Sequence, residues 1–225
     1  MFESTIIEKL SEHKYDIDYV RNGFKSFNKS DTKISFEVET NDLLNKEPIV
    51  QQVDSEIIFF LSVNKFDYHY KMSIGQNNLN QQLKDFILDK LQKDANHSGN
   101  FSVSSDVESA DLNVILKINS IENFSKLFES TDAILFFYNH NYSVGSSTSN
   151  LIAEIEIHKD KKLVFSDTLS SNPIYGYQPG NLLISDERLF DWAVKDQAES
   201  FSKSIRDINN KAIEQVNEFL KNTKK

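Results

Sequence analysis

Five histidines are the first candidates for chemistry, because imidazole can act as a general base or as a metal ligand near neutral pH. They are His13, His69, His97, His140 and His158. No two of them follow the H-x-x-x-H or H-x-H spacing that places two imidazoles on one face of a helix or strand. A histidine metal site would therefore need ligands assembled from distant parts of the chain. The sequence predicts neither a metal nor another cofactor.

Three carboxylates, Asp106, Glu108 and Asp111, form the densest acidic cluster near the middle of the chain. The cluster lacks the central Gly and the terminal Glu of a twelve-residue calcium loop. Paired carboxylates also serve in glycoside hydrolysis, but a chain with 34 acidic residues offers many such pairs. We interpret these three as solvated loop side chains.

Motifs of nucleophilic and phosphate chemistry are missing. Gly145-Ser146-Ser147 lacks the G-x-S-x-G spacing of a nucleophile elbow, and neither G-x-G-x-x-G nor G-x-x-x-x-G-K-[ST] occurs. The chain has no cysteine, which excludes thiol catalysis, disulfides and Cys-ligated metals. The sequence therefore predicts a protein that is not an enzyme.

The segment at 173–180 has the composition of a docking loop. Its prolines reduce the entropy lost on binding, and a tyrosine ring can be buried at an interface while its hydroxyl stays hydrated. Because proline has no N–H to donate, we expect this segment to stay outside the sheet ladder. The predicted partner-binding residues are Pro173, Ile174, Tyr175, Tyr177 and Pro179. The alternative is that the two tyrosines fold back onto the sheet.

The charge balance limits the classes of partner. With 25 basic and 34 acidic residues the formal charge is −9, which argues against nucleic acid as a partner. Apolar runs are far shorter than a membrane-spanning helix needs. The chain opens Met-Phe-Glu-Ser-Thr, without the basic and apolar regions of a signal peptide, so none is expected at this start.

Residues 55–121 carry the clearest pattern of secondary structure. The apolar run at 57–63 predicts a strand, and a short extended piece is expected at 101–103. Residues 111–121 alternate apolar and polar side chains, which predicts a strand with one buried face. Between them a helical stripe predicts an amphipathic helix over 77–94; its members are Leu79, Leu83, Phe86, Ile87 and Leu91.

The rest of the chain divides into an N-terminal extension and a main domain. Residues 1–50 predict a helix and a strand at Ile34, Phe36 and Val38, with too few apolar side chains to close a core alone. Residues 51–225 form the predicted main domain.

Within the main domain, residues 122–131 are expected to be a loop or a single helical turn, 133–138 a buried strand, and 145–150 a loop of small residues. Residues 151–158 and 163–169 predict the two arms of a hairpin. One uninterrupted helix of about 35 residues is expected from Ser185 onward, because no Gly or Pro follows. The predicted fold class is α+β, with a mainly antiparallel sheet and with the amphipathic helix and the long C-terminal helix packed on one face.

The helix at 79–91 followed by Ala110-Asp111-Leu112-Asn113-Val114 resembles a pattern of small bacterial envelope lipoproteins. These are the lipopolysaccharide-assembly lipoprotein LptE, YajG-like lipoproteins and the N-terminal part of curli-secretion lipoproteins. The resemblance implies a non-enzymatic role in an envelope assembly and anchoring by a lipidated N-terminal Cys, which this sequence lacks. No functional residue is carried over from it.

Three hypotheses follow for function. The first is a non-catalytic component of a bacterial envelope assembly or transport complex, which would be periplasmic and bind another envelope protein. It would meet a membrane only through a lipid anchor, and a cytoplasmic location is the alternative. The second hypothesis is a module that holds a lipid or other apolar ligand between helix and sheet. The third is an enzyme without a familiar motif.

Overall fold

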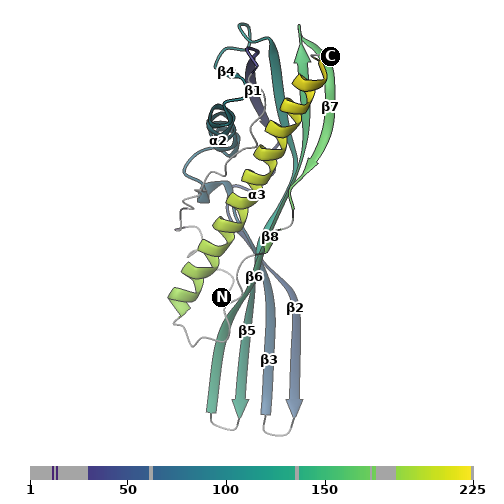
Figure 1. Cartoon of the computed structure of the whole chain (residues 1–225). Coiled ribbons are helices and arrows are strands. Elements are labelled where there is room, and N and C mark those ends of the chain that lie inside the picture. The colour runs from purple at the N-terminus through teal and green to yellow at the C-terminus, as the bar shows by residue number, and fades with distance from the viewer. Residues whose placement is uncertain are drawn as a thin grey trace.

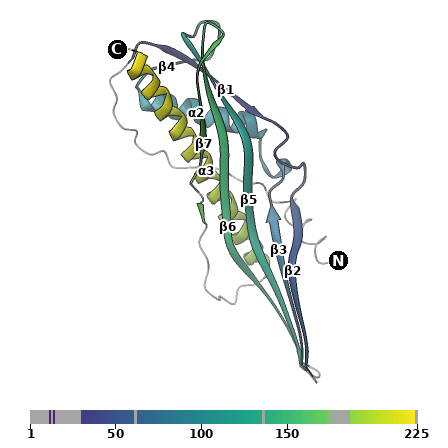
Figure 2. The same cartoon turned by 90° about the vertical axis from the view of Figure 1, so that its right-hand side faces the viewer.

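The computed structural model describes residues 12, 14, 30–60, 63–134, 137–172, 174–175 and 186–223. These residues form a sheet of eight strands, two α-helices and one short 3-10 helix. Both α-helices pack on one side of the sheet (Figures 1 and 2). Most strand pairs are antiparallel, and only β1 makes parallel pairs, with β4 and β5. The predicted α+β class and the placement of both helices are confirmed.

The sheet is organised around its two longest strands. The strands are β1 (Lys33–Thr40), β2 (Ile49–Phe60), β3 (Val63–Ser73), β4 (Ser102–Ser104), β5 (Leu112–Ile134), β6 (Phe137–Lys159), β7 (Lys162–Ser170) and β8 (Ile174–Tyr175). β5 pairs with β6 along almost its whole length. On its other side β5 pairs first with β1 and then with β3. The sheet therefore has two halves, ordered β4-β1-β5-β6-β7 and β2-β3-β5-β6.

The first half carries the core under helices α2 (Leu83–Ser98) and α3 (Asp186–Thr223). The predicted alternation in β5 is confirmed, because Leu112, Val114, Leu116 and Ile118 are all buried. The amphipathic stripe is likewise buried, although the α-helix begins at Leu83 and a 3-10 turn (Gln76–Asn78) precedes it. Apolar burial of this kind is the main favourable term in folding.

Helix α3 is one element of 38 residues, as predicted. It packs on β6 and β5 and touches α2. Its buried apolar side chains recur at helical spacing, which explains why one face can cover the sheet without a break. They include Phe201, Ile205, Ile208, Ala212 and Val216.

The loops predicted at 122–131 and 145–150 are wrong, because both stretches lie inside β5 and β6. Apart from Leu127, the buried side chains of these stretches are polar, so the sequence shows no regular apolar alternation there. The hydroxyls of Ser125 and Ser147 are 2.7 Å apart, and the Ser147 N–H donates to Asp196 on α3 at 3.3 Å. Partners supplied by the helix thus replace the apolar contacts that a strand normally makes.

Gly145 has a packing role in β6 rather than a turn role. A Cβ at this position would lie 2.9 Å from Phe128 Cε2 and 3.0 Å from Lys126 Cβ. Only a residue without a side chain fits at that distance.

The apolar runs at 57–63 and 133–138 each contain a chain reversal. β2 ends at Phe60 and β3 begins at Val63, while β5 ends at Ile134 and β6 begins at Phe137. The single strand predicted across the first run is wrong. The buried strand predicted for the second is also wrong, because the side chain of Phe137 is 80% exposed.

The proposed domain boundary at residue 50 falls inside β2. β1, from the predicted extension, pairs with both β5 and β4. Among the described helices, none combines the length and apolarity required to cross a membrane.

Candidate binding surface: the projecting sheet

Four strands continue beyond the two helices and form what we call the projecting sheet (Figure 1). It comprises residues 54–60 of β2, 63–69 of β3, 128–134 of β5 and 137–143 of β6. Registers join them into rows across the sheet, for example Ile57–Phe66–Thr131–His140 and Ile58–Lys65–Asp132–Asn139. Figure 2 shows the same strands running past the helices when the molecule is turned.

One face of the projecting sheet is rich in aromatic residues. Phe59 and Phe66 lie edge to face with ring centroids 5.6 Å apart, and Tyr68 and Tyr70 have centroids 6.5 Å apart. Because side chains two residues apart in a strand share a face, this face is continuous with buried Tyr70 and Met72. It therefore extends the core face beyond the helices.

The opposite face is polar and internally paired. Lys65 Nζ lies 2.8 Å from Asp67, and the Ser130 hydroxyl donates to the same carboxylate at 2.8 Å. The hydrogen bond to Asp67 raises the pKa of Lys65, and the bond from Lys65 lowers the pKa of Asp67. His69 lies edge-on to Phe128 with a centroid distance of 4.9 Å. These contacts hold charged forms of both signs on this face.

The far end of the projecting sheet is apolar on both faces. Its last row joins Phe60, Val63, Ile134 and Phe137. In β2 three consecutive side chains are exposed: Ile57 by 49%, Ile58 by 42% and Phe59 by 70%. Successive side chains of a strand point to opposite faces, so this exposure is not confined to one side. We call Ile57, Ile58, Phe59 and Phe137 the apolar end.

The two edges of the projecting sheet differ. β2 carries Asp54 and Glu56 and has a bulge between Gln52 and Asp54, which are features that discourage pairing with another chain. Residues 137–147 of β6 contain no Asp, Glu, Lys, Arg or Pro. Within the described part of the chain, no strand pairs with this stretch on the side away from β5. Among the described residues, the edge of β6 is thus open and free of charge and proline over 137–143, whereas a register shift lies between Val144 and Ser147 and the Ser147 N–H donates to Asp196 on α3.

The predicted partner-binding segment starts as part of the sheet. Ile174 and Tyr175 form β8, which pairs with Ser149 and Thr148 of β6. The expectation that the segment stays outside the ladder is therefore wrong for these two residues. Pro173, Tyr177 and Pro179 lie outside the described residues, and the docking role remains a prediction.

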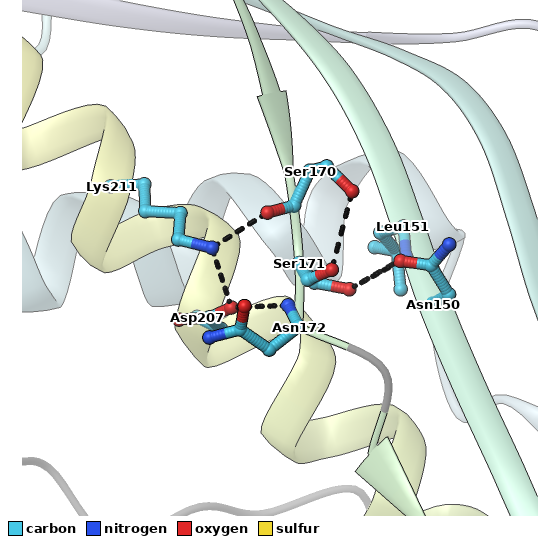
Figure 3. A network of polar contacts seen from close by, with 7 residues as sticks. All are labelled: Asn150, Leu151, Ser170, Ser171, Asn172, Asp207 and Lys211. Atoms are coloured by element: carbon cyan, nitrogen blue, oxygen red, sulfur yellow. Dashed lines mark hydrogen bonds and ion pairs between the residues drawn. The ribbon is translucent and has the colours of Figure 1, made fainter.

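A polar network fixes the chain just before β8 (Figure 3). Lys211 on α3 donates to the Ser170 carbonyl at 2.6 Å and pairs with Asp207 at 3.0 Å. Asp207 also accepts the Asn172 N–H at 2.7 Å, and Ser171 accepts the Leu151 N–H at 2.8 Å. The end of β7 is thereby tied to α3 and to β6.

The carboxylates of the acidic cluster accept hydrogen bonds from backbone N–H groups. Asp111 accepts the Lys33 N–H at 2.7 Å, and Asp106 accepts the Glu108 N–H at 3.0 Å. Glu108 and Asp111 help to line an open hollow of about 540 Å³. Asp106 therefore bonds within its loop, whereas Asp111 joins the loop to the start of β1.

A second charged cluster lies on the outer face of the sheet. Glu156 accepts from Lys117 at 2.6 Å and lies 2.9 Å from His158 Nε2. The bond from Lys117, and then that to His158, lowers the pKa of Glu156. Searched over the described residues, no three His, Asp or Glu side chains lie together in a way that could hold a metal ion.

Comparison with known proteins identifies no family. No family model and no curated protein matches the chain. Among solved structures, a DUF330-family protein from Xanthomonas campestris is similar, with 9% identity, a TM-score of 0.48, and coverage of 89% of this chain and 96% of that one. A putative neuraminyllactose-binding hemagglutinin homolog from Helicobacter pylori has 10% identity, a TM-score of 0.34, and coverage of 93% and 99%. Neither likeness, at these scores, assigns a function to the chain.

Sequence reasoning overlooked the projecting sheet. The useful signal was a run of five consecutive apolar residues, Ile57 to Leu61, between the charged residues Glu56 and Lys65. Consecutive apolar residues are typical of a strand buried on both faces, so the run resembled core. The residues between the strands are Leu61-Ser62 and Leu135-Phe136, and of these only Ser62 is of a type common in turns.

Proposed function

We propose that the protein is a non-catalytic component of a bacterial cell-envelope assembly or transport complex and acts by protein–protein contact. Its partner adds a strand to the open edge of β6 at residues 137–143. The envelope setting, in the periplasm, draws its support from the resemblance of the 79–91 helix and of Ala110-Asp111-Leu112 to envelope lipoproteins. The mode of binding draws its support from the edge.

The open edge of β6, free of charge and proline at 137–143, is the observation that carries the proposal. An edge strand has unpaired N–H and C=O groups along one side, and natural proteins usually block them with charge, proline, bulges or a covering element. β2 has such protection in Asp54, Glu56 and a bulge, whereas residues 137–143 of β6 have no charge, no proline and no register shift. Strand addition uses these groups for affinity and alternate side-chain pockets for specificity.

The alternative is a module that binds a lipid or other apolar ligand. A hollow of about 340 Å³ beside the 43–49 stretch favours it, because Leu43, Leu44 and Ile74 contribute to its wall. Lys71 and Glu122 line the same hollow, and Lys71 Nζ lies 3.8 Å from the centre of the Phe124 ring. The space between α3 and the sheet is filled by buried side chains such as Phe201 and Leu127. This packing favours protein contact over a ligand held there.

A proline scan combined with cross-linking tests the proposal. Along an antiparallel edge strand, the N–H groups of successive residues point alternately toward the paired strand and away from it. Of Asn141→Pro and Tyr142→Pro, one therefore removes an N–H that points outward, and the other removes an N–H that bonds to β5. The variant that keeps the wild-type melting temperature is the edge variant. The matched control is Ala at the same position, which keeps the N–H.

A photo-reactive phenylalanine at exposed Ser143 then reports the partner in living cells. We expect a cross-linked adduct with one specific protein in the wild type and in the Ala control, and no such adduct in the edge variant. An adduct of equal strength in the edge variant, or no adduct in any background, refutes strand addition. Cell fractionation of the same strain checks the envelope location.

A further inference from the structure

The apolar end of the projecting sheet exposes more apolar surface than a partner on one face could cover. Phe59 and Phe137 are 70% and 80% exposed, and the neighbouring Ile57 and Ile58 point to opposite faces. From this arrangement we infer that the apolar end inserts shallowly into a bilayer of zwitterionic lipid. This inference goes beyond the proposed function, because it concerns the end of the sheet and not its edge.

Apolar residues lie on both faces of the apolar end, as expected if lipid surrounds it on all sides. A protein groove or a flat interface contacts one face of a sheet, and the other face would then remain polar. Here the last row, Phe60–Val63–Ile134–Phe137, is apolar in all four strands. No Asp, Glu, Lys or Arg occurs between Glu56 and Lys65 or between Asp132 and Glu154. A lipid surface encloses such an end from every side, with no charge to desolvate.

Charged residues set the depth of insertion. Lys65 and Asp132 are register partners two rows behind the last row. Ile58 lies in the same row as this pair and Ile57 one row behind it, so Phe59 and Phe137 are the members of the apolar end that lie beyond the pair. At a rise of about 3.3 Å per residue, the last row lies about 7 Å beyond it. That depth lies within the roughly 5–10 Å by which interfacial segments enter a membrane. The backbone of the two open edges then stays near headgroups and water, which a deeper insertion would not allow.

The signs of charge behind the apolar end select the headgroup. Lys65 is held protonated beside Asp67, and Asp132 is its register partner, so both signs face the lipid surface at one level. A zwitterionic headgroup offers phosphate to the lysine and ammonium to the carboxylates. The formal charge of −9 disfavours a strongly anionic surface.

Vesicle flotation with the full chain tests the inference. The probe is a vesicle of phosphatidylethanolamine and phosphatidylcholine, and the comparison vesicle contains added phosphatidylglycerol. We expect wild type to float with the zwitterionic vesicle and no better with the anionic one. Phe59→Ser/Phe137→Ser should lower the partition coefficient at least tenfold.

A matched control tests whether vesicle binding depends on the apolar end or on any exposed apolar side chain. Leu163→Ser/Val164→Ser removes two exposed apolar side chains from β7, in the helix-covered half. This control should float like wild type. Both double variants should stay folded because the changed side chains are exposed, and Phe59→Ser should lower the melting temperature by only a few degrees through loss of the ring contact with Phe66. Equal loss in both double variants, or no flotation of wild type, overturns the inference.

A depth measurement gives an independent result. Trp192 is the single tryptophan, so Phe137→Trp in a Trp192→Phe background reports position 137 alone. We expect its emission to shift to the blue on vesicle addition and to be quenched by lipids brominated near the headgroup end of the chain. Unchanged emission contradicts insertion, as does a photo-adduct from position 137 to a protein without vesicle binding.

The two proposals fail separately. The proline edge variant should still float with vesicles, and the Phe59→Ser/Phe137→Ser variant should still form the adduct from position 143 in detergent extract. If the wild-type protein forms the adduct but does not float with vesicles, insertion is refuted and strand addition stands. If the wild-type protein floats but forms no adduct, strand addition is refuted and insertion stands.

Discussion

Truncation of Leu116 to alanine should destabilise the protein strongly. Leu116 is the fifth residue of β5 and has no exposed surface. Its register partners are Val38 on β1 and Ile155 on β6, which are both fully buried. Since neighbours on both sides belong to paired strands, they cannot move far enough to fill the cavity. Leu→Ala at such sites costs about 2–5 kcal/mol, and we expect about 3 kcal/mol or more here.

The loss can be measured by urea unfolding and by thermal melting. For a chain of this size about 1 kcal/mol corresponds to 2–4 °C in melting temperature, so the expected drop is about 6–12 °C. The matched control is Leu163→Ala, because Leu163 is 54% exposed in the same sheet. Its change should stay within about 0.5 kcal/mol. A Leu116→Ala cost below about 1 kcal/mol, with an unchanged urea slope, would show that the β1-β5-β6 packing is wrong.

Three further changes test other parts of the structure. Glu156→Gln should reduce the loss of folding stability on acidification. The pKa of Glu156 is lower in the folded state than in the unfolded state, so the carboxylate stabilises the fold above its unfolded-state pKa, and this stabilisation is lost as the pH falls through its folded-state pKa. Melts between pH 3 and 6 in which the variant and wild type lose stability in parallel would contradict this. Gly145→Ala should cost about 1–3 kcal/mol in urea, because the new Cβ meets the Phe128 ring and Lys126, and a neutral result would mean that β6 shifts freely there. Lys211→Met should speed amide exchange at Asn172 without changing global stability, and unchanged exchange would rule out the network as the anchor of β8.

Side-chain periodicity predicted the elements whose packing is uniform along their length. The α2 stripe and the β5 alternation from Leu112 to Ile118 each bury one face against apolar neighbours, so spacing alone reveals them. Asn123, Ser125 and Ser147 broke the pattern because they place polar side chains inward. The Asn123 amide donates to the Gln197 carbonyl on α3, which is distant in sequence, and the hydroxyls of Ser125 and Ser147 bond to each other. Tertiary contacts of this kind leave no local signal.

The candidate site was harder to predict than the core. The sequence drew attention to the prolines and tyrosines at 173–180, where residue types are distinctive. The edge of β6 at 137–143 is defined by what does not pair with it, and the row Phe60–Val63–Ile134–Phe137 forms only when four strands come into register. Parallel pairing of β1 with β5 joins residues 78 positions apart, such as Ile34 and Leu112, and no local pattern indicates it.

β5 and β6, with 23 residues each, belong to both halves of the sheet. The projection therefore has no linker at its base and cannot be removed as a module, because cutting it would cut the two strands that hold the core. Its length can change only by deletions made together in the facing strands. Each deletion must also remove an even number of residues per strand, since an odd number would turn every side chain beyond it to the other face. Natural or engineered variants with a shorter or longer projection should differ from this chain by an even number of residues in each strand, with the same change in the facing strands.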